Sequence, residues 1–156
     1  MLELIRKSSF SNDFIAKENG VLVAELDRAT WSQTAKVEIQ GKTYGFEKTG
    51  VLHNVYKLLD GDNEVVEVEQ PSAWQSKLVF HLNQKEYVLD TKNWFSSALK
   101  IEQDGDVIGD IHSAGMLGNT IVVDLPDTLP LPVRIFVGWI AVLRIEETTA
   151  VIVAAT

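Results

Sequence analysis

Turn-forming residues recur at almost constant intervals along this chain, and that spacing is its strongest structural constraint. Gly, Asn and Asp tolerate the positive φ that tight hairpin turns require. The candidate hairpin tips lie about 21 residues apart, at Glu18-Asn19-Gly20, Gln40-Gly41-Lys42, Asp60-Gly61-Asp62-Asn63, Asn83-Gln84-Lys85 and Asp104-Gly105-Asp106. Other turn-formers lie midway between them, so the chain reverses about every ten residues. This spacing predicts an all-β fold built of short, consecutive strands.

The segments between these turns alternate between apolar and polar residues, as strands with one buried face do. In "AKVEIQ", for example, Val37 and Ile39 share one face, and Lys36 and Glu38 share the other. The predicted strands are 2–8, 13–18, 21–27, 34–39, 42–48, 53–59, 64–69, 77–82, 86–91, 97–103, 107–112 and 119–124. A meander of twelve strands would leave open edges that invite aggregation, and closure into a barrel removes them. We therefore expect a closed, antiparallel, up-and-down barrel over residues 2–124.

The apolar tail after Pro130 is predicted to fill the interior of such a barrel. A barrel of more than about eight strands has an interior that its own side chains cannot fill. Residues 131–147, "LPVRIFVGWIAVLRIEE", are apolar almost all round, which is typical of a membrane span or of a helix buried in a core. A span would place Arg144, Glu146 and Glu147 near the bilayer centre, where charges are costly. We predict a central helix over 131–147 and no membrane span. The following "TTAVIVAAT" fits either more helix or an extended tail.

The predicted core joins the inward residues of the strands to the helix. Its members are Val37, Ile39, Leu78, Phe80, Leu82, Leu99, Ile101, Ile121, Val123, Phe136, Val137, Trp139, Ile140 and Leu143.

Composition narrows the class of protein further. A length of 156 residues fits one domain over 1–156. The absence of cysteine leaves no disulfide framework or thiolate site, and it fits a reducing compartment. A net charge of −8 disfavours nucleic-acid binding. The N-terminus has no signal-peptide pattern, so we expect a cytoplasmic protein.

The turn spacing together with the proline-led tail "LPDTLPLPVRIFVGWIAVLRIEE" resembles the tubby C-terminal-like fold over the whole chain. That group includes tubby-like proteins, phospholipid scramblases and LURP-one-related proteins, and the tail is similar to that of small prokaryotic members. The resemblance implies a non-enzymatic binding or regulatory domain, with a lipid headgroup or a protein as partner. Two departures weaken the transfer of specific functions. The basic residues are scattered among acids, and "DGDNE", with Asp60, Asp62 and Glu64, lacks the spacing of a Ca²⁺ loop.

No motif for catalysis, cofactor binding or metal binding stands out. "TYG" at Thr43–Gly45 lies on a predicted strand, whereas a fluorophore triad needs a central helix. His53, His81 and His112 fall on separate predicted strands without metal-ligand spacing. Nucleophile-elbow and phosphate-loop patterns are absent. We expect no cofactor and no metal, and we keep two alternatives: a small-molecule carrier using space in the barrel, and an enzyme whose site assembles in three dimensions.

Two sets of residues are candidates for interaction. Trp31, Trp74 and Trp94 fall in connections at one end of the predicted barrel, where they either cap the core or form a contact rim. Arg134 and Arg144 lie on the apolar helix, and we expect each near one barrel end, exposed or paired with an acid. The nearby acids are Asp124, Asp127, Glu146 and Glu147. An anion site is the alternative for the arginines.

Overall fold

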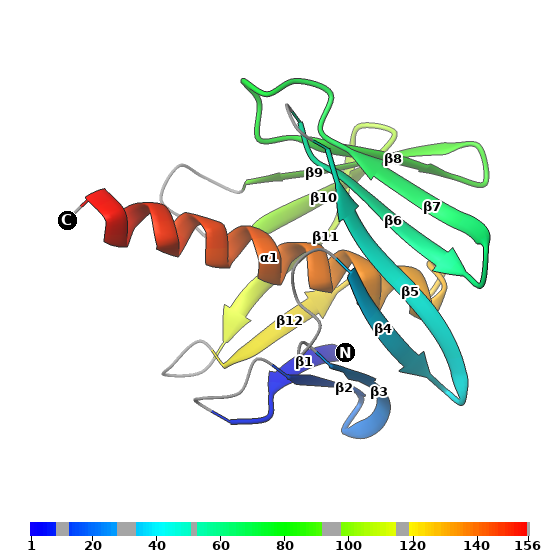
Figure 1. The fold of residues 1–156 in the computed structure, drawn as a ribbon. Helices are drawn as coiled ribbons and strands as arrows, with labels where there is room; N and C mark the ends of the chain where they lie inside the picture. Colours follow the sequence, from blue (N-terminus) through cyan, green and yellow to red (C-terminus); the bar gives the residue numbers. More distant parts are fainter. Residues whose placement is uncertain (9–12, 28–33, 51–52, 92–97, 115–118, 156) are drawn as a thin grey trace.

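The computed structural model describes residues 1–8, 13–27, 34–50, 53–91, 98–114 and 119–155. These residues form twelve strands and one helix (Figure 1). The strands are β1 (Leu2–Arg6), β2 (Phe14–Glu18), β3 (Val21–Leu26), β4 (Thr34–Ile39), β5 (Lys42–Thr49), β6 (Val55–Asp60), β7 (Asn63–Glu69), β8 (Leu78–Leu82), β9 (Lys85–Thr91), β10 (Leu99–Gln103), β11 (Asp106–Ala114) and β12 (Thr120–Asp124). The helix is α1 (Leu131–Ala155).

The strands close into an antiparallel barrel in sequence order, and β1 pairs with β12. The predicted fold class, a closed twelve-stranded barrel with a C-terminal helix, is therefore confirmed. The strand boundaries differ from the prediction by a few residues at most. One of these differences moves a candidate residue: β6 begins at Val55, so His53 lies before the strand and not on it.

Five short hairpin turns lie at one end of the barrel, which we call the tight-turn end. Several of these turns have two consecutive residues with positive φ, for example Asn19 (51°) with Gly20 (82°) and Asp104 (50°) with Gly105 (91°). This is the conformation of type I′ turns, whose twist matches that of the flanking strands. At the opposite end, which we call the long-connection end, the strands β1, β3, β5, β7, β9 and β11 end and the strands β2, β4, β6, β8, β10 and β12 begin.

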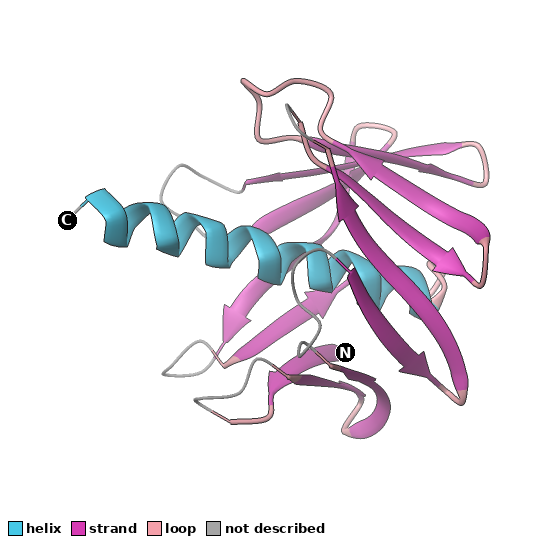
Figure 2. Ribbon diagram, viewed as in Figure 1, coloured by secondary structure: helices cyan, strands magenta, loops and turns pink. Residues whose placement is uncertain are grey.

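Helix α1 starts at the tight-turn end, because the short connection from β12 leads directly into it. It runs through the barrel and projects beyond the strands at the long-connection end, where the chain terminates (Figures 1 and 2). The helix is longer than the predicted 131–147, since the apolar segment after Glu147 continues it to Ala155. Among the described residues, we find no helix with the length and apolar character needed to cross a bilayer.

The core forms where the helix fills the barrel. Residues 133–142 of the helix are buried almost without interruption. Phe46 of β5 contacts both Phe136 and Trp139, with ring centroids 5.2 and 5.4 Å apart. Gly138 lets the helix approach the wall closely, because a Cβ there would lie 2.8 Å from side-chain atoms of Leu4 and Val123.

The predicted core is mostly correct. Every residue predicted for it is buried except Leu82 and Leu143, which are half-buried and pack against its edge. Leu82 is the last residue of β8 beside a hairpin turn, and Leu143 lies where the helix approaches the barrel exit. Burial therefore decreases toward both ends of the barrel, which an alternation pattern does not reveal.

Candidate functional site

Trp74 is the most exposed large apolar side chain among the described residues, with 96% of its surface accessible. It lies in the connection between β7 and β8, at the long-connection end. A tryptophan on a water-exposed connection loses the stabilisation that burial of its ring would provide. Trp74 therefore does not cap the core, which was one of its two predicted roles, and its ring is available for contact.

Hydrogen bonds on both sides hold the connection that carries Trp74. The side chain of Gln70 accepts a bond from Asn54 Nδ2 (3.2 Å), and its own Nε2 donates to the carbonyl of Gln75 (2.6 Å). Within the connection, the Trp74 amide donates to Ser72 Oγ (3.2 Å) and the Gln75 amide to the Ser72 carbonyl (3.2 Å). The backbone around Trp74 is thus braced, which lowers the entropy that a contact would cost.

Arg144 joins the helix to the same connection. One guanidinium nitrogen (Nη2) donates to the Ser76 carbonyl (2.9 Å), and the Ser76 hydroxyl donates to Asp90 Oδ1 (3.2 Å) on β9. At the long-connection end, the connection that carries Trp74 is therefore also bonded to Arg144 of the helix. The other two tryptophans of the predicted rim, Trp31 and Trp94, lie outside the described residues.

Arg134 lies near the other end of the barrel and is almost fully buried. Its Nη1 lies 2.6 Å from Glu18 Oε1 at the end of β2, and its Nε donates to the Leu129 carbonyl (2.9 Å). Asp127 is 3.8 Å away and almost fully exposed. Arg134 is thus in an ion pair with a strand acid. Glu18 was not among the expected partners, because 116 positions separate the two residues and no local pattern links them.

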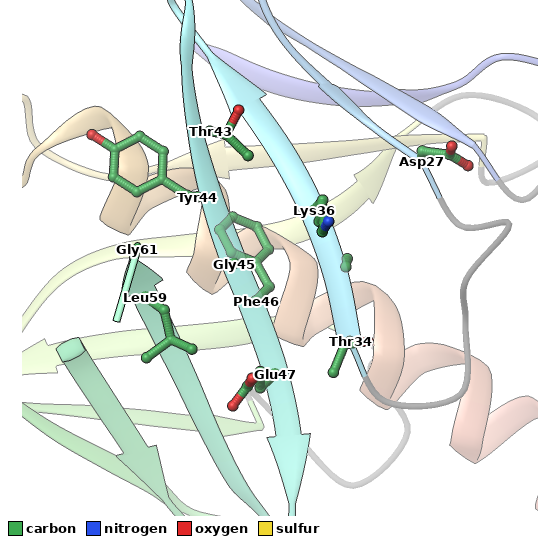
Figure 3. Close-up of a pocket in the computed structure, with 11 residues that line it drawn as sticks. Asp27, Thr34, Lys36, Thr43, Tyr44, Gly45, Phe46, Glu47, Leu59 and Gly61 are labelled. Atoms are coloured by element: carbon green, nitrogen blue, oxygen red, sulfur yellow. The ribbon is translucent and has the colours of Figure 1, made fainter. Parts of the chain in front are cut away.

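The barrel wall carries a hollow of about 590 Å³ beside β4, β5 and β6 (Figure 3). Its polar lining includes Asp27, Thr34, Lys36, Thr43 and Glu47, and the buried side chains of Ala35 and Phe46 contribute an apolar floor. Mixed polar and apolar lining is typical of small-molecule sites. No sequence pattern indicates this hollow, because its residues come from separate strands and share no motif.

The remaining candidate motifs have structural roles. Thr43–Gly45 lies on β5, as expected for an ordinary strand. Asp60 forms an ion pair with Lys42 (2.7 Å), and Asp104 accepts a hydrogen bond from the Glu86 amide (3.2 Å). His81 lies 3.4 Å from Glu86, and His112 lies 3.1 Å from Asp110. Within the part of the chain that the structure describes, no three His, Asp or Glu side chains gather closely enough to hold a metal ion.

Comparison with known proteins found no match among protein families, curated proteins or solved structures. The resemblance to the tubby C-terminal-like group therefore stays a prediction from the turn spacing and the tail.

Proposed function

We propose that this protein is a non-enzymatic binding domain that contacts the headgroup region of a lipid bilayer with the long-connection end of its barrel. The observation that carries the proposal is the exposure of Trp74 on a braced connection. Tryptophan favours the boundary between headgroups and acyl chains, because its ring is apolar and its N–H is polar.

The distribution of charge favours membrane contact through the long-connection end over contact through the tight-turn end. The hairpin tips and the helix entry at the tight-turn end carry exposed acids, which anionic headgroups would repel, at Asp62, Asp104, Asp106 and Asp127. Basic residues flank the long-connection end, at Arg6, Lys48, Lys77 and Arg144. Each lysine or arginine near an anionic surface contributes roughly 1 kcal/mol. With a net charge of −8, the protein would approach an anionic membrane by this end.

Co-flotation with vesicles tests the proposal. Purified protein is mixed with phosphatidylcholine vesicles with or without phosphoinositide, at low and at physiological salt. We expect flotation with phosphoinositide vesicles that decreases as salt rises. Trp74→Ala should abolish flotation, and Arg144→Gln should reduce it. Val107→Ala is the matched control, because Val107 is an exposed apolar residue (64%) at the opposite end of the barrel.

Two results would count against membrane contact. The first is an absence of flotation at both salt concentrations, which would leave a protein as the partner for Trp74. The second is equal flotation of wild type and Trp74→Ala, which would place the lipid contact elsewhere on the surface.

The hollow in Figure 3 favours a second candidate function, that of a small-molecule carrier. The ligand would lie in this hollow of the wall. Native mass spectrometry of the purified protein would show a bound small molecule. Gly45→Val, which fills the hollow from β5, should remove it. A spectrum with the apoprotein mass alone would argue against a carrier.

A further inference from the structure

Among the described strands, neighbours β7 and β8 share the fewest paired residues, and we call this part of the wall the β7–β8 seam. Strand β7 pairs with β6 at six residue pairs, and β8 pairs with β9 at five. Between β7 and β8, both of which are described from end to end, the pairing consists of Glu69↔Val79 alone. The two strands diverge from that pair toward their hairpin turns (Figure 1).

The divergence leaves backbone groups of β7 facing the seam. The Gln70 amide donates to the Asn54 carbonyl (2.9 Å), on the β6 side. Backbone groups alternate in direction along a strand, so those of Glu69 and Glu67 point the other way, toward β8. Glu69 pairs there with Val79, and no further residue of β7, Glu67 included, pairs with β8. An unpaired strand edge of this kind is a template for another strand.

A cleft of about 400 Å³ accompanies the seam. Val65 and the alternating glutamates of β7 line one side, and Val79 and His81 of β8 line the other. Val65 is 42% exposed although it is apolar. The lining of the cleft is therefore mainly polar, and Val65 adds one exposed apolar side chain beside the unpaired backbone, which an added strand could contact.

The charge of the cleft indicates what kind of segment fits it. Glu64, Glu67 and Glu69 all line the cleft. Lys57 lies 3.5 Å from Glu64, and His81 is engaged with Glu86 at 3.4 Å. A side-chain hydrogen bond with Glu64, followed by burial, raises the pKa of the Glu67 carboxyl. The glutamates thus outnumber the cations that would neutralise them, and a cation entering the cleft would be stabilised.

We propose that the β7–β8 seam is a docking site for an extended, lysine- or arginine-bearing segment of a partner protein, which adds a strand to β7. Successive side chains of the added strand would point to opposite faces of the wall. Its lysine or arginine side chains would face outward and contact the glutamates, and its apolar side chains would face inward and contact the core. This site lies on the side wall of the barrel, and it is independent of the membrane contact proposed for Trp74.

Fluorescence polarisation with a labelled peptide of alternating lysine and valine tests the docking site at physiological salt. A second peptide has the same sequence with N-methyl groups on alternate backbone amides, so that its charge is kept and its strand hydrogen bonds are lost. Two protein variants with equal net charge complete the design. Glu67→Lys alters the seam. Glu38→Lys alters an outward residue of β4 that pairs with β3 on one side and with β5 on the other.

We expect the unmethylated peptide to bind the wild type, and N-methylation or Glu67→Lys to weaken binding by about tenfold or more. Glu38→Lys should leave binding within about twofold. Hydrogen exchange of the Glu67 amide in the wild type should slow when the peptide binds, which provides a readout even if Glu67→Lys folds poorly. The proposal is overturned by absent binding, by equal binding of the methylated peptide, by equal losses in the two variants, or by unchanged exchange at Glu67.

Discussion

The guanidinium of Arg134 and the carboxylate of Glu18 form an ion pair of 2.6 Å that joins the first turns of the central helix to the end of β2. Arg134 is almost fully buried, whereas Glu18 is partly exposed. Removal of the carboxylate would leave a buried, unpaired cation, which costs more stability than the ion pair itself contributes. The contact therefore couples the position of the helix to the closure of the barrel.

Removal of Glu18 should therefore destabilise the protein. We expect Glu18→Ala to lower the free energy of unfolding by about 2 kcal/mol, less than for a fully buried pair because Glu18 retains some solvent. Asp127→Ala should have a much smaller effect, since Asp127 is exposed and lies 3.8 Å away. Urea denaturation of both variants measures the difference. Equal losses would show that Glu18 is not the principal partner.

Gly138→Ala should also destabilise the protein, although alanine is the better helix former. The added Cβ would lie 2.8 Å from Leu4 Cδ1 and Val123 Cγ2. Overpacking of this kind costs about 1–3 kcal/mol, against a gain of about 1 kcal/mol in helix propensity. Gly45→Ala is the control, because its Cβ would meet Leu59 at an ordinary 3.6 Å. A thermal midpoint for Gly138→Ala at or above wild type would refute the tight approach.

Ile140→Asp should abolish soluble folding. Ile140 is fully buried on the helix, and a carboxylate there would lose its hydration without gaining a partner. Circular dichroism of the variant tests whether the barrel needs this helix. Val107→Asp, at an exposed site, should fold normally. A folded Ile140→Asp protein would show that the helix is dispensable to the core.

Gln70→Ala should loosen the connection that carries Trp74 while leaving the barrel intact. It removes the bonds to Asn54 and Gln75, which lie at an exposed or half-buried site and contribute about 1 kcal/mol each at most. Backbone amides of residues 72–76 should exchange faster, and vesicle flotation should weaken. Unchanged exchange in this segment would mean that other contacts brace it.

The Glu67 carboxyl should titrate above its ordinary value of 4.5, and NMR titration of the side-chain carboxyl carbon measures this directly. Since the folded-state pKa is raised, the protonated form favours folding below the ordinary pKa, and this contribution is lost as pH rises through the folded-state pKa. Glu64→Ala should return the pKa toward 4.5, because Glu64 supplies the largest raising effect. Lys57→Ala should raise it further, because Lys57 lowers it. A Glu67 pKa at 4.5 in the wild type would contradict the close carboxyl pair.

Local patterns in the sequence were enough to predict the strands, the turns and the central helix. Alternation such as Val37 and Ile39 against Lys36 and Glu38 reports which face of a strand is buried, and turn residues such as Asn19-Gly20 report where the chain reverses. These signals are local, so they can be read without knowledge of distant partners. Charges within the apolar tail, at Arg134, Arg144 and Glu146, likewise favoured a helix buried in protein.

The features on which the functional proposals depend arise from the assembled barrel and could not be predicted from local patterns. Closure of the barrel brought Glu18 to Arg134, and the assembled wall limits the pairing of β7 with β8 to Glu69 and Val79. Trp74 is exposed on a connection that the side chain of Gln70 braces. Each of these relationships joins residues whose positions follow from the assembled barrel, and alternation or turn chemistry carries no information about such pairs.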